Sequence, residues 1–243
     1  MKPVLFLLLV FWSVMACKNC KDPDSFGVTV TKPHILDTIG KSSKTDTLSL
    51  FKQNLKQLTK THDTVFVNLR DFSDDFVYDL KYATEDNFLK TAVYECAACY
   101  VRAATAKALL KANQDFMTKG FRIKFFDCYR PNDVQWQMWE LVPNPQYVAN
   151  PAKGSIHNKG GAVDITLVDT SGKELDMGTS FDFFGEEAHH DYTSHPDTVL
   201  KNRALLKQIM EKHGFWSIRT EWWHYNLTAL SNARVANFKW PCP

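Results

Sequence analysis

The sequence predicts an α+β domain in which helices pack on one central, mainly antiparallel sheet. Residues 102–119 and 198–212 keep their apolar side chains at the helical period of about 3.6. Around them lie short segments rich in β-branched and aromatic residues, joined by short connections that suit antiparallel pairing. The irregular order of helices and strands favours one mixed domain over a repeated strand–helix–strand fold.

The expected elements follow one another from about Asp63. They are strands at 65–67 and 76–80, a helix at 102–119, a strand at 121–126, a helix at 132–141, a strand at 162–168, a helix at 198–212, and an antiparallel pair at 215–218 and 222–227. Gly120 stands where a left-handed helix cap belongs. Pro131 ends the strand before it, and Asn132 is expected to cap the next helix.

Residues 1–16 have the pattern of an export signal. Lys2 gives a positive start, residues 4–14 form an apolar run too short to remain as a membrane-spanning helix, and Ala16 directly precedes Cys17. This pattern resembles the lipobox of bacterial lipoproteins. We therefore expect lipidation of Cys17 and an exported lipoprotein, anchored to a membrane and facing the periplasm or exterior. An ordinary secretory signal is the alternative.

Residues 17–62 have the composition of a tether, because polar and turn-forming residues dominate and large apolar residues are few. An amphipathic helix at about 48–58 either docks on the domain or lies on a membrane. The catalytic domain is expected over 63–243.

Composition limits the possible functions. With 243 residues, 44% of them apolar and 23% charged, the chain suits one globular domain and not a multi-span membrane protein. The net charge of +2, without any basic block, makes nucleic acid an unsuitable partner.

Apart from Cys17, the cysteines are odd in number: Cys20, Cys96, Cys99, Cys128 and Cys242. The spacing of Cys96 and Cys99 resembles half of a zinc ribbon or a redox pair. A second such pair is missing, however, and no thioredoxin-like context surrounds this one. A structural disulfide that involves Cys96 or Cys99 is the favoured interpretation for an exported chain.

Two short motifs, at 155–164 and 221–224, contain the donors for a catalytic zinc site. His157, Asp164 and His224 supply three ligands, which leaves a position for water. Asp164 lies inside an apolar run, where an unpaired carboxylate would be costly. Glu221 precedes His224 by three residues, so we expect it in a turn or at a bulge, facing the same site. There it would act as general base on a zinc-activated water in amide hydrolysis.

Arg130, at a strand end, is the candidate for stabilising the oxyanion or anchoring a substrate carboxylate. Alternatively, it pairs with Asp127 or Asp133. Glu221 could likewise pair with Arg219.

Trp222 and Trp223 are more typical of a core than of a substrate platform. His189, His190 and His195 form a rival metal cluster, but this cluster has no carboxylate base placed as well as Glu221.

The two motifs, together with Tyr129-Arg130-Pro131, resemble those of the D-alanyl-D-alanine dipeptidases of the vancomycin-resistance type. These are zinc peptidases of the D,D-peptidase/hedgehog structural group. The similarity extends over residues 63–230 and includes the segments 79–84, 86–88, 176–178, 181–183 and 189–190.

The resemblance implies one zinc ion per chain, held by His157, Asp164 and His224, with Glu221 as catalytic base and Arg130 stabilising the transition state. It further implies a small pocket for the free D-Ala-D-Ala dipeptide. The residues expected to line that pocket are Tyr82, Ser155 and Asp182. An anionic Asp182 suits a substrate ammonium, and Ser155 with Arg130 suits a carboxylate.

Two alternatives remain. One is a zinc D,D-carboxypeptidase or endopeptidase that acts on longer wall peptides, and the other is a non-catalytic wall-binding module of the same fold. An exported, tethered enzyme suits dipeptides released during peptidoglycan turnover, since a resistance enzyme must act in the cytoplasm before the dipeptide is incorporated.

Overall fold

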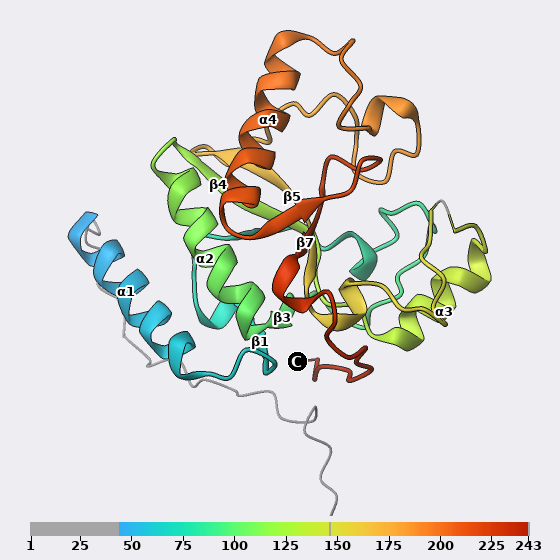
Figure 1. Cartoon of the computed structure of the whole chain (residues 1–243), viewed down its shortest axis with the longest axis horizontal. Helices are drawn as coiled ribbons and strands as arrows, with labels where there is room; N and C mark the ends of the chain where they lie inside the picture. The colour runs from blue at the N-terminus through green and yellow to red at the C-terminus, as the bar shows by residue number, and fades with distance from the viewer. Residues whose placement is uncertain (1–43, 146, 243) are drawn as a thin grey trace, which may run out of the picture.

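A five-stranded sheet, in the order β2-β4-β5-β7-β6, organises the protein (Figure 1). The computed structural model describes residues 44–145 and 147–242. The strands of this sheet are β2 Val77–Tyr78, β4 Phe121–Asp127, β5 Ala162–Asp169, β6 Phe215–Ser217 and β7 His224–Leu227. β2 pairs with β4 in parallel, and the other neighbouring strands pair antiparallel. The predicted α+β class with a mainly antiparallel sheet is confirmed.

Two helices, α2 (Ala103–Met117) and α4 (Asp197–Lys212), pack against the sheet and against each other (Figure 1). A smaller two-stranded sheet pairs β1 (Phe66–Asn68) with β3 (Tyr100–Arg102), directly before α2. The helix α3 (Asn132–Leu141) lies to one side. Short 3-10 turns occupy Leu69–Asp71, Lys81–Ala83, His157–Lys159, Glu186–Ala188 and Thr228–Leu230.

β5 is buried along nearly its whole length, and its two faces differ in chemistry. Val163, Ile165 and Leu167 belong to the main apolar core, which also contains Leu206 and Met210 of α4. Because strand side chains alternate between faces, Asp164 and the residues in register with it lie on the opposite face of the sheet. The fold therefore has an apolar face covered by helices and an opposite face, called the polar face below, that carries Asp164.

The first described helix, α1 (Lys44–Lys60), is longer than the predicted 48–58. Its Leu58 is fully buried in the main core, Phe51 packs against the same core, and the helix contacts α2. Of the two alternatives for this helix, the structure shows docking on the domain. The end of the stretch with tether-like composition is thus ordered against the domain.

The predicted signal at 1–16, Cys17 and the tether up to residue 43 lie outside the described residues. Among the residues that are described, no helix has both the length and the apolar character needed to cross a membrane.

The predicted left-handed conformation of Gly120 after α2 is confirmed by its φ of +83°, although the helix itself ends at Met117, before the predicted residue 119. The predicted capping role of Asn132 is wrong. Pro131 occupies the cap position of α3, and Asn132 is the first helical residue. The Asn132 backbone N–H donates to the Ala236 carbonyl, and that of the next residue donates to the Asn237 side chain. The C-terminal segment therefore satisfies the free N–H groups that a capping side chain would have served.

The disulfide prediction is confirmed for both cysteines of the close pair. Cys96 bonds to Cys242, which ties the C-terminal segment to the domain, and Cys99 bonds to Cys128 at the end of β4. Cys20 lies outside the described residues.

Candidate active site

Three polar residues lie side by side across the polar face of the sheet. In register, Asp164 of β5 is opposite His224 of β7 on one side and Asp127 of β4 on the other. The register of β4 shifts between Phe125 and Asp127, so one extra residue is inserted there. Without that bulge, Asp127 would point to the apolar face, because a shift of one residue exchanges the two faces of a strand.

His157 reaches the same place from the 3-10 turn just before β5. Gly160 ends this turn with a φ of +67°, and a Cβ atom there would collide with the ring of Phe66. The Gly160 carbonyl accepts hydrogen bonds from the Arg102 backbone and from the Thr105 hydroxyl, both at the start of α2. Glycine at this position therefore lets the turn pack tightly against β1 and α2, which fixes the position of His157.

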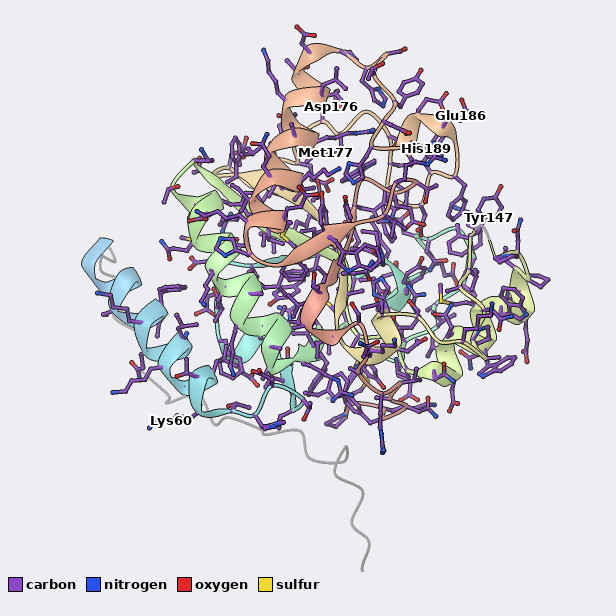
Figure 2. All side chains as sticks on the ribbon, in the orientation of Figure 1. Lys60, Tyr147, Asp176, Met177, Glu186 and His189 are labelled. Carbon is purple, nitrogen blue, oxygen red and sulfur yellow. A yellow bond between two sulfur atoms is a disulfide. The ribbon has the colours of Figure 1, made fainter. Side chains whose placement is uncertain are left out.

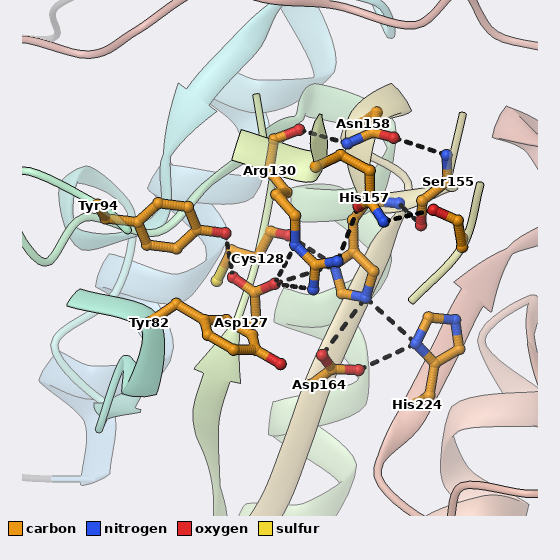
Figure 3. A network of polar contacts seen from close by, with 12 residues as sticks. Tyr82, Tyr94, Asp127, Cys128, Arg130, Ser155, His157, Asn158, Asp164 and His224 are labelled. Atoms are coloured by element: carbon orange, nitrogen blue, oxygen red, sulfur yellow. Dashed lines mark hydrogen bonds and ion pairs between the residues drawn. The ribbon is translucent and has the colours of Figure 1, made fainter. Parts of the chain in front are cut away.

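The predicted ligands His157, Asp164 and His224 converge (Figure 3). Nε2 of His157 lies 3.2 Å from Nδ1 of His224 and 3.4 Å from Asp164 Oδ2, and His224 Nδ1 lies 2.9 Å from Asp164 Oδ1. All three side chains are buried. Donor atoms bonded to one tetrahedral zinc ion stand roughly 3.3 Å apart, for bonds of about 2.0 Å. The observed separations fit that geometry.

The outer nitrogens of both imidazoles are engaged by acceptors. Nδ1 of His157 donates to the Cys128 carbonyl at 2.7 Å, and Nε2 of His224 donates to Oδ1 of Asn226 at 2.9 Å. In neutral rings, both inner nitrogens then present lone pairs toward the carboxylate of Asp164. Such a cluster of acceptors suits a cation, and outer hydrogen bonds of this kind are typical of metal-bound histidines.

The charges of the group agree with a cation site. Burial raises the pKa of Asp164, but the charge and hydrogen bond of His157, and then those of His224, outweigh it and hold the pKa well below its usual range. Burial lowers the pKa of His224, yet the hydrogen bond and charge of Asp164 outweigh it, so the pKa is raised. Asp164 is thus a carboxylate anion, and its surroundings favour positive charge.

Glu221 lies in the connection that precedes β7, as predicted from its odd spacing to His224. One of its carboxylate oxygens is 3.9 Å from Nδ1 of His224. Burial, with a further contribution from Asp164, raises the pKa of Glu221 against the opposing effect of His224. The alternative partner Arg219 pairs instead with Asp191, at 3.1 Å. Glu221 therefore lies beside His157, Asp164 and His224, called the metal group below, without belonging to it.

Arg130 is held in a buried clamp (Figure 3). Its Nε and Nη2 donate to one oxygen of Asp127 at 3.2 and 2.7 Å, and Nη1 donates to Gln135 at 2.9 Å. Tyr94 donates to the other Asp127 oxygen at 2.8 Å. The guanidinium also lies over the ring of Tyr82, 5.2 Å from its centroid. Of the two alternative acidic partners, the structure shows Asp127.

A cavity of about 350 Å³, the inner cavity, joins these groups. Its lining includes all the predicted site residues: the metal group, Glu221, Arg130, Tyr82, Ser155 and Asp182. Tyr82 donates a hydrogen bond of 2.9 Å to Asp182, which has a φ of +57°. Burial and then the charge of Asp164 raise the pKa of Asp182 well above its usual range, against the opposing effects of the Tyr82 hydrogen bond and the charge of Arg130.

The rival cluster of histidines is not assembled. His189 lies beside Arg219, His195 contacts the carbonyl of Glu187, and Nε2 of His190 is buried without a hydrogen-bond partner. In the part of the chain that the structure describes, His157, Asp164 and His224 form the only group of its kind suited to a metal ion. Trp222 and Trp223 are buried in the core, as predicted, although Trp223 also lines the inner cavity.

Sequence reasoning missed several residues that support the site. Asn226 follows His224 by two residues in the same strand, so the alternation of faces could have identified it. The sequence suggests Asp127 only as an ion-pair partner of Arg130. Tyr94 and Gln135 carry no sequence signal of their role, because the chain brings them to Asp127 and Arg130 from separate segments.

Comparison with known proteins agrees with this geometry. Residues 62–240 match the model of peptidase family M15, described as D-ala-D-ala dipeptidase. The chain is 38% identical over 179 residues to a D-alanyl-D-alanine dipeptidase of Escherichia coli (strain K12), covering 74% of this chain and 93% of that protein. A protein of the same name from Enterococcus faecium is 35% identical over 182 residues, covering 64% of this chain and 90% of its own. A third, from Enterococcus faecalis (strain ATCC 700802 / V583), is 34% identical over 172 residues, covering 62% and 85%. With the family match over most of its length, the chain belongs to the D-ala-D-ala dipeptidase family of M15 metallopeptidases.

Proposed function

We propose that this protein hydrolyses the free dipeptide D-alanyl-D-alanine in a zinc-dependent reaction. The observation that supports this most strongly is the arrangement of the inner cavity. The metal group and Glu221 lie in the same cavity as an acidic side chain, Asp182, and a basic one, Arg130. A free dipeptide has one ammonium and one carboxylate, so a small cavity with both complements suits it.

His157, Asp164 and His224 are the residues that would hold zinc, through two imidazole nitrogens and one carboxylate oxygen. Bound zinc supplies Lewis acidity, which makes water a competent nucleophile near neutral pH and polarises a carbonyl group. The Cys128 carbonyl and Asn226 keep the two imidazoles in the tautomers that direct lone pairs inward.

Glu221 is proposed as the general base. It is close enough to the metal group to take a proton from the attacking water, and the same carboxyl can return that proton to the leaving amine nitrogen. Burial raises the pKa of Glu221, and this suits both proton transfers. Its proton affinity is then closer to those of the attacking water and the leaving amine.

Arg130 is proposed to stabilise the negative charge that develops on the substrate carbonyl oxygen. The clamp of Asp127 and Gln135 fixes its guanidinium before substrate arrives, so little reorganisation is needed during the reaction. Ser155, with Arg130, is proposed to receive the substrate carboxylate, and Asp182, supported by Tyr82, the substrate ammonium.

We further propose that the domain has the D,D-peptidase/hedgehog type of fold and acts outside the cytoplasm. In this proposal residues 1–16 are a lipoprotein signal, 17–62 join the anchor to the domain at 63–243, and lipidated Cys17 binds the membrane. The enzyme would then degrade dipeptides released from peptidoglycan. Mass spectrometry of the membrane fraction should find a diacylglyceryl mass on Cys17, and an unmodified Cys17 would refute the anchor.

A substrate panel tests the proposed reaction. Zinc-loaded protein should cleave D-Ala-D-Ala and leave N-acyl-D-Ala-D-Ala and a wall pentapeptide intact. Cleavage of only the blocked or long peptides would establish a carboxypeptidase or endopeptidase instead. A folded protein that binds zinc and cleaves none of the three would indicate a wall-binding module.

A further inference from the structure

A second cavity, the outer cavity, adjoins the inner one. It measures about 460 Å³ and shares part of its lining with the inner cavity. The residues that line the outer cavity alone are Glu186, His189 and Arg219. The residues that line both cavities, called the wall below, are Pro145, Tyr147, Phe184, Thr220 and Glu221.

The centre of this wall is a contact between two aromatic rings. The ring centroids of Tyr147 and Phe184 lie 4.3 Å apart, with a tilt of 32° between their planes. The two residues come from different segments, Tyr147 from the loop after α3 and Phe184 from the connection between β5 and α4. Figure 2 labels Tyr147 on its loop, and Glu186 and His189 on the segment nearby. The pair thus joins two segments at the boundary between the cavities.

One half of this aromatic pair is held firmly. Phe184 packs edge-to-face on Phe88 at 5.1 Å, and Phe88 packs edge-to-face on Tyr82 at 6.2 Å. Phe184 is therefore part of the same aromatic cluster that holds the site residue Tyr82. Tyr147 is 40% exposed, so its contact with Phe184 is the outer edge of the wall.

The wall includes a residue close in sequence to Asp182, the proposed partner of the substrate ammonium. Phe184 follows Asp182 by two residues, and both line the inner cavity. If Asp182 receives the substrate ammonium, as in the proposed function, a peptide extended at its amino end must continue past Asp182. An extension that leaves the inner cavity toward the outer cavity meets the rings of Tyr147 and Phe184, which line both.

We infer that the Tyr147–Phe184 pair determines substrate length, because it closes the dipeptide pocket on the ammonium side. This inference rests on the proposed function. Removal of the rings would connect the two cavities and give an N-extended peptide access to a space lined by polar side chains. Glu186, His189 and Arg219 there can form hydrogen bonds with a peptide backbone.

The test compares D-Ala-D-Ala with N-acetyl-D-Ala-D-Ala and D-Ala-D-Ala-D-Ala, using the zinc-loaded full chain. The variants are Tyr147→Ala, Phe184→Ala and the double variant, and the measured quantity is the ratio of kcat/KM for an extended peptide to that for the dipeptide. The matched control is Phe183→Ala, because Phe183 is adjacent, 39% exposed and lines neither cavity. Zinc content and thermal unfolding verify that each variant is folded.

We expect the ratio to rise at least about tenfold in the double variant and to stay at the wild-type value in Phe183→Ala. Comparing the ratios between variants removes the effect of the blocked or displaced ammonium, because each extended peptide is the same for every variant. If the wild type cleaves the dipeptide and folded variants keep its ratio, the role of the pair is refuted while the proposed function stands. A wild type that cleaves the extended peptides as well as the dipeptide would refute both the length limit and the pair's role in it.

Discussion

Removal of the buried Asp127 carboxylate should lower the free energy of unfolding by several kcal/mol, because this carboxylate is the counter-ion of Arg130. Asp127 is fully buried and accepts hydrogen bonds from Arg130 at 3.2 and 2.7 Å and from Tyr94 at 2.8 Å. The substitution Asp127→Asn keeps the side-chain volume, so it creates no cavity. It leaves the buried guanidinium without its nearest negative charge.

The expected loss follows from these contacts. Removal of one partner of a buried ion pair costs about 3–5 kcal/mol, and the retained amide oxygen keeps one acceptor, so we expect about 3 kcal/mol. Asp191→Asn is the matched control, because it breaks another Arg–Asp pair, with Arg219, whose side chains are 62% and 61% exposed. This control should cost less than about 1 kcal/mol.

Urea denaturation of zinc-loaded protein at neutral pH measures both free energies of unfolding. Turnover should also fall, by about a hundredfold, because Arg130 is no longer held in place beside the metal group. In the double variant Asp127→Asn with Arg130→Met, the loss of stability should be smaller than the sum of the single losses, since the unpaired charge is gone. If Asp127→Asn costs no more than Asp191→Asn, the clamp does not exist as described.

Three further predictions concern other parts of the molecule. Leu58→Ala should lower the free energy of unfolding by about 3 kcal/mol, because Leu58 of α1 is buried in the main core. The exposed Leu50→Ala should change it by less than about 0.5 kcal/mol. Equal effects of the two substitutions would contradict the docking of α1 on the domain. Asn226→Ala should weaken zinc binding about 10–100-fold in a chelator competition, because the outer nitrogen of His224 loses its acceptor, and unchanged affinity would exclude that role. Burial, with Lys207 and Arg203, lowers the pKa of His190 from 6.5 to about 4. Between those pH values the unfolded chain binds a proton that the folded chain does not, so stability should fall by up to about 3 kcal/mol as the pH is lowered through this range; His190→Gln should flatten that pH dependence, and an identical slope in the variant would refute it.

Much of the fold could be predicted where the pattern of one segment determines its structure. The apolar run that contains Asp164 identified β5, and the helical periodicity ending at Gly120 identified α2. The metal group was predictable for a related reason. A carboxylate within a buried strand and histidines in short, distinctive motifs are unusual enough to indicate one metal site.

The remaining features depend on contacts between distant segments. Alternation along 121–126 predicted a strand, but not the bulge that turns Asp127 to the polar face, because an inserted residue leaves no mark in the pattern. Asn132 has the composition of a helix cap, and the C-terminal segment displaces it from that role. The Tyr147–Phe184 contact likewise arises only when two loops meet.

The measurement that tests the central claim most directly is the zinc content and the D-Ala-D-Ala turnover of Glu221→Gln, determined on the same preparation. This substitution removes the proton acceptor and keeps its shape. We predict about one zinc ion per chain for both this variant and the wild type, with the kcat of the variant reduced by about two to four orders of magnitude. Loss of zinc would show that Glu221 is a ligand, and turnover near the wild-type rate would show that it is not the general base.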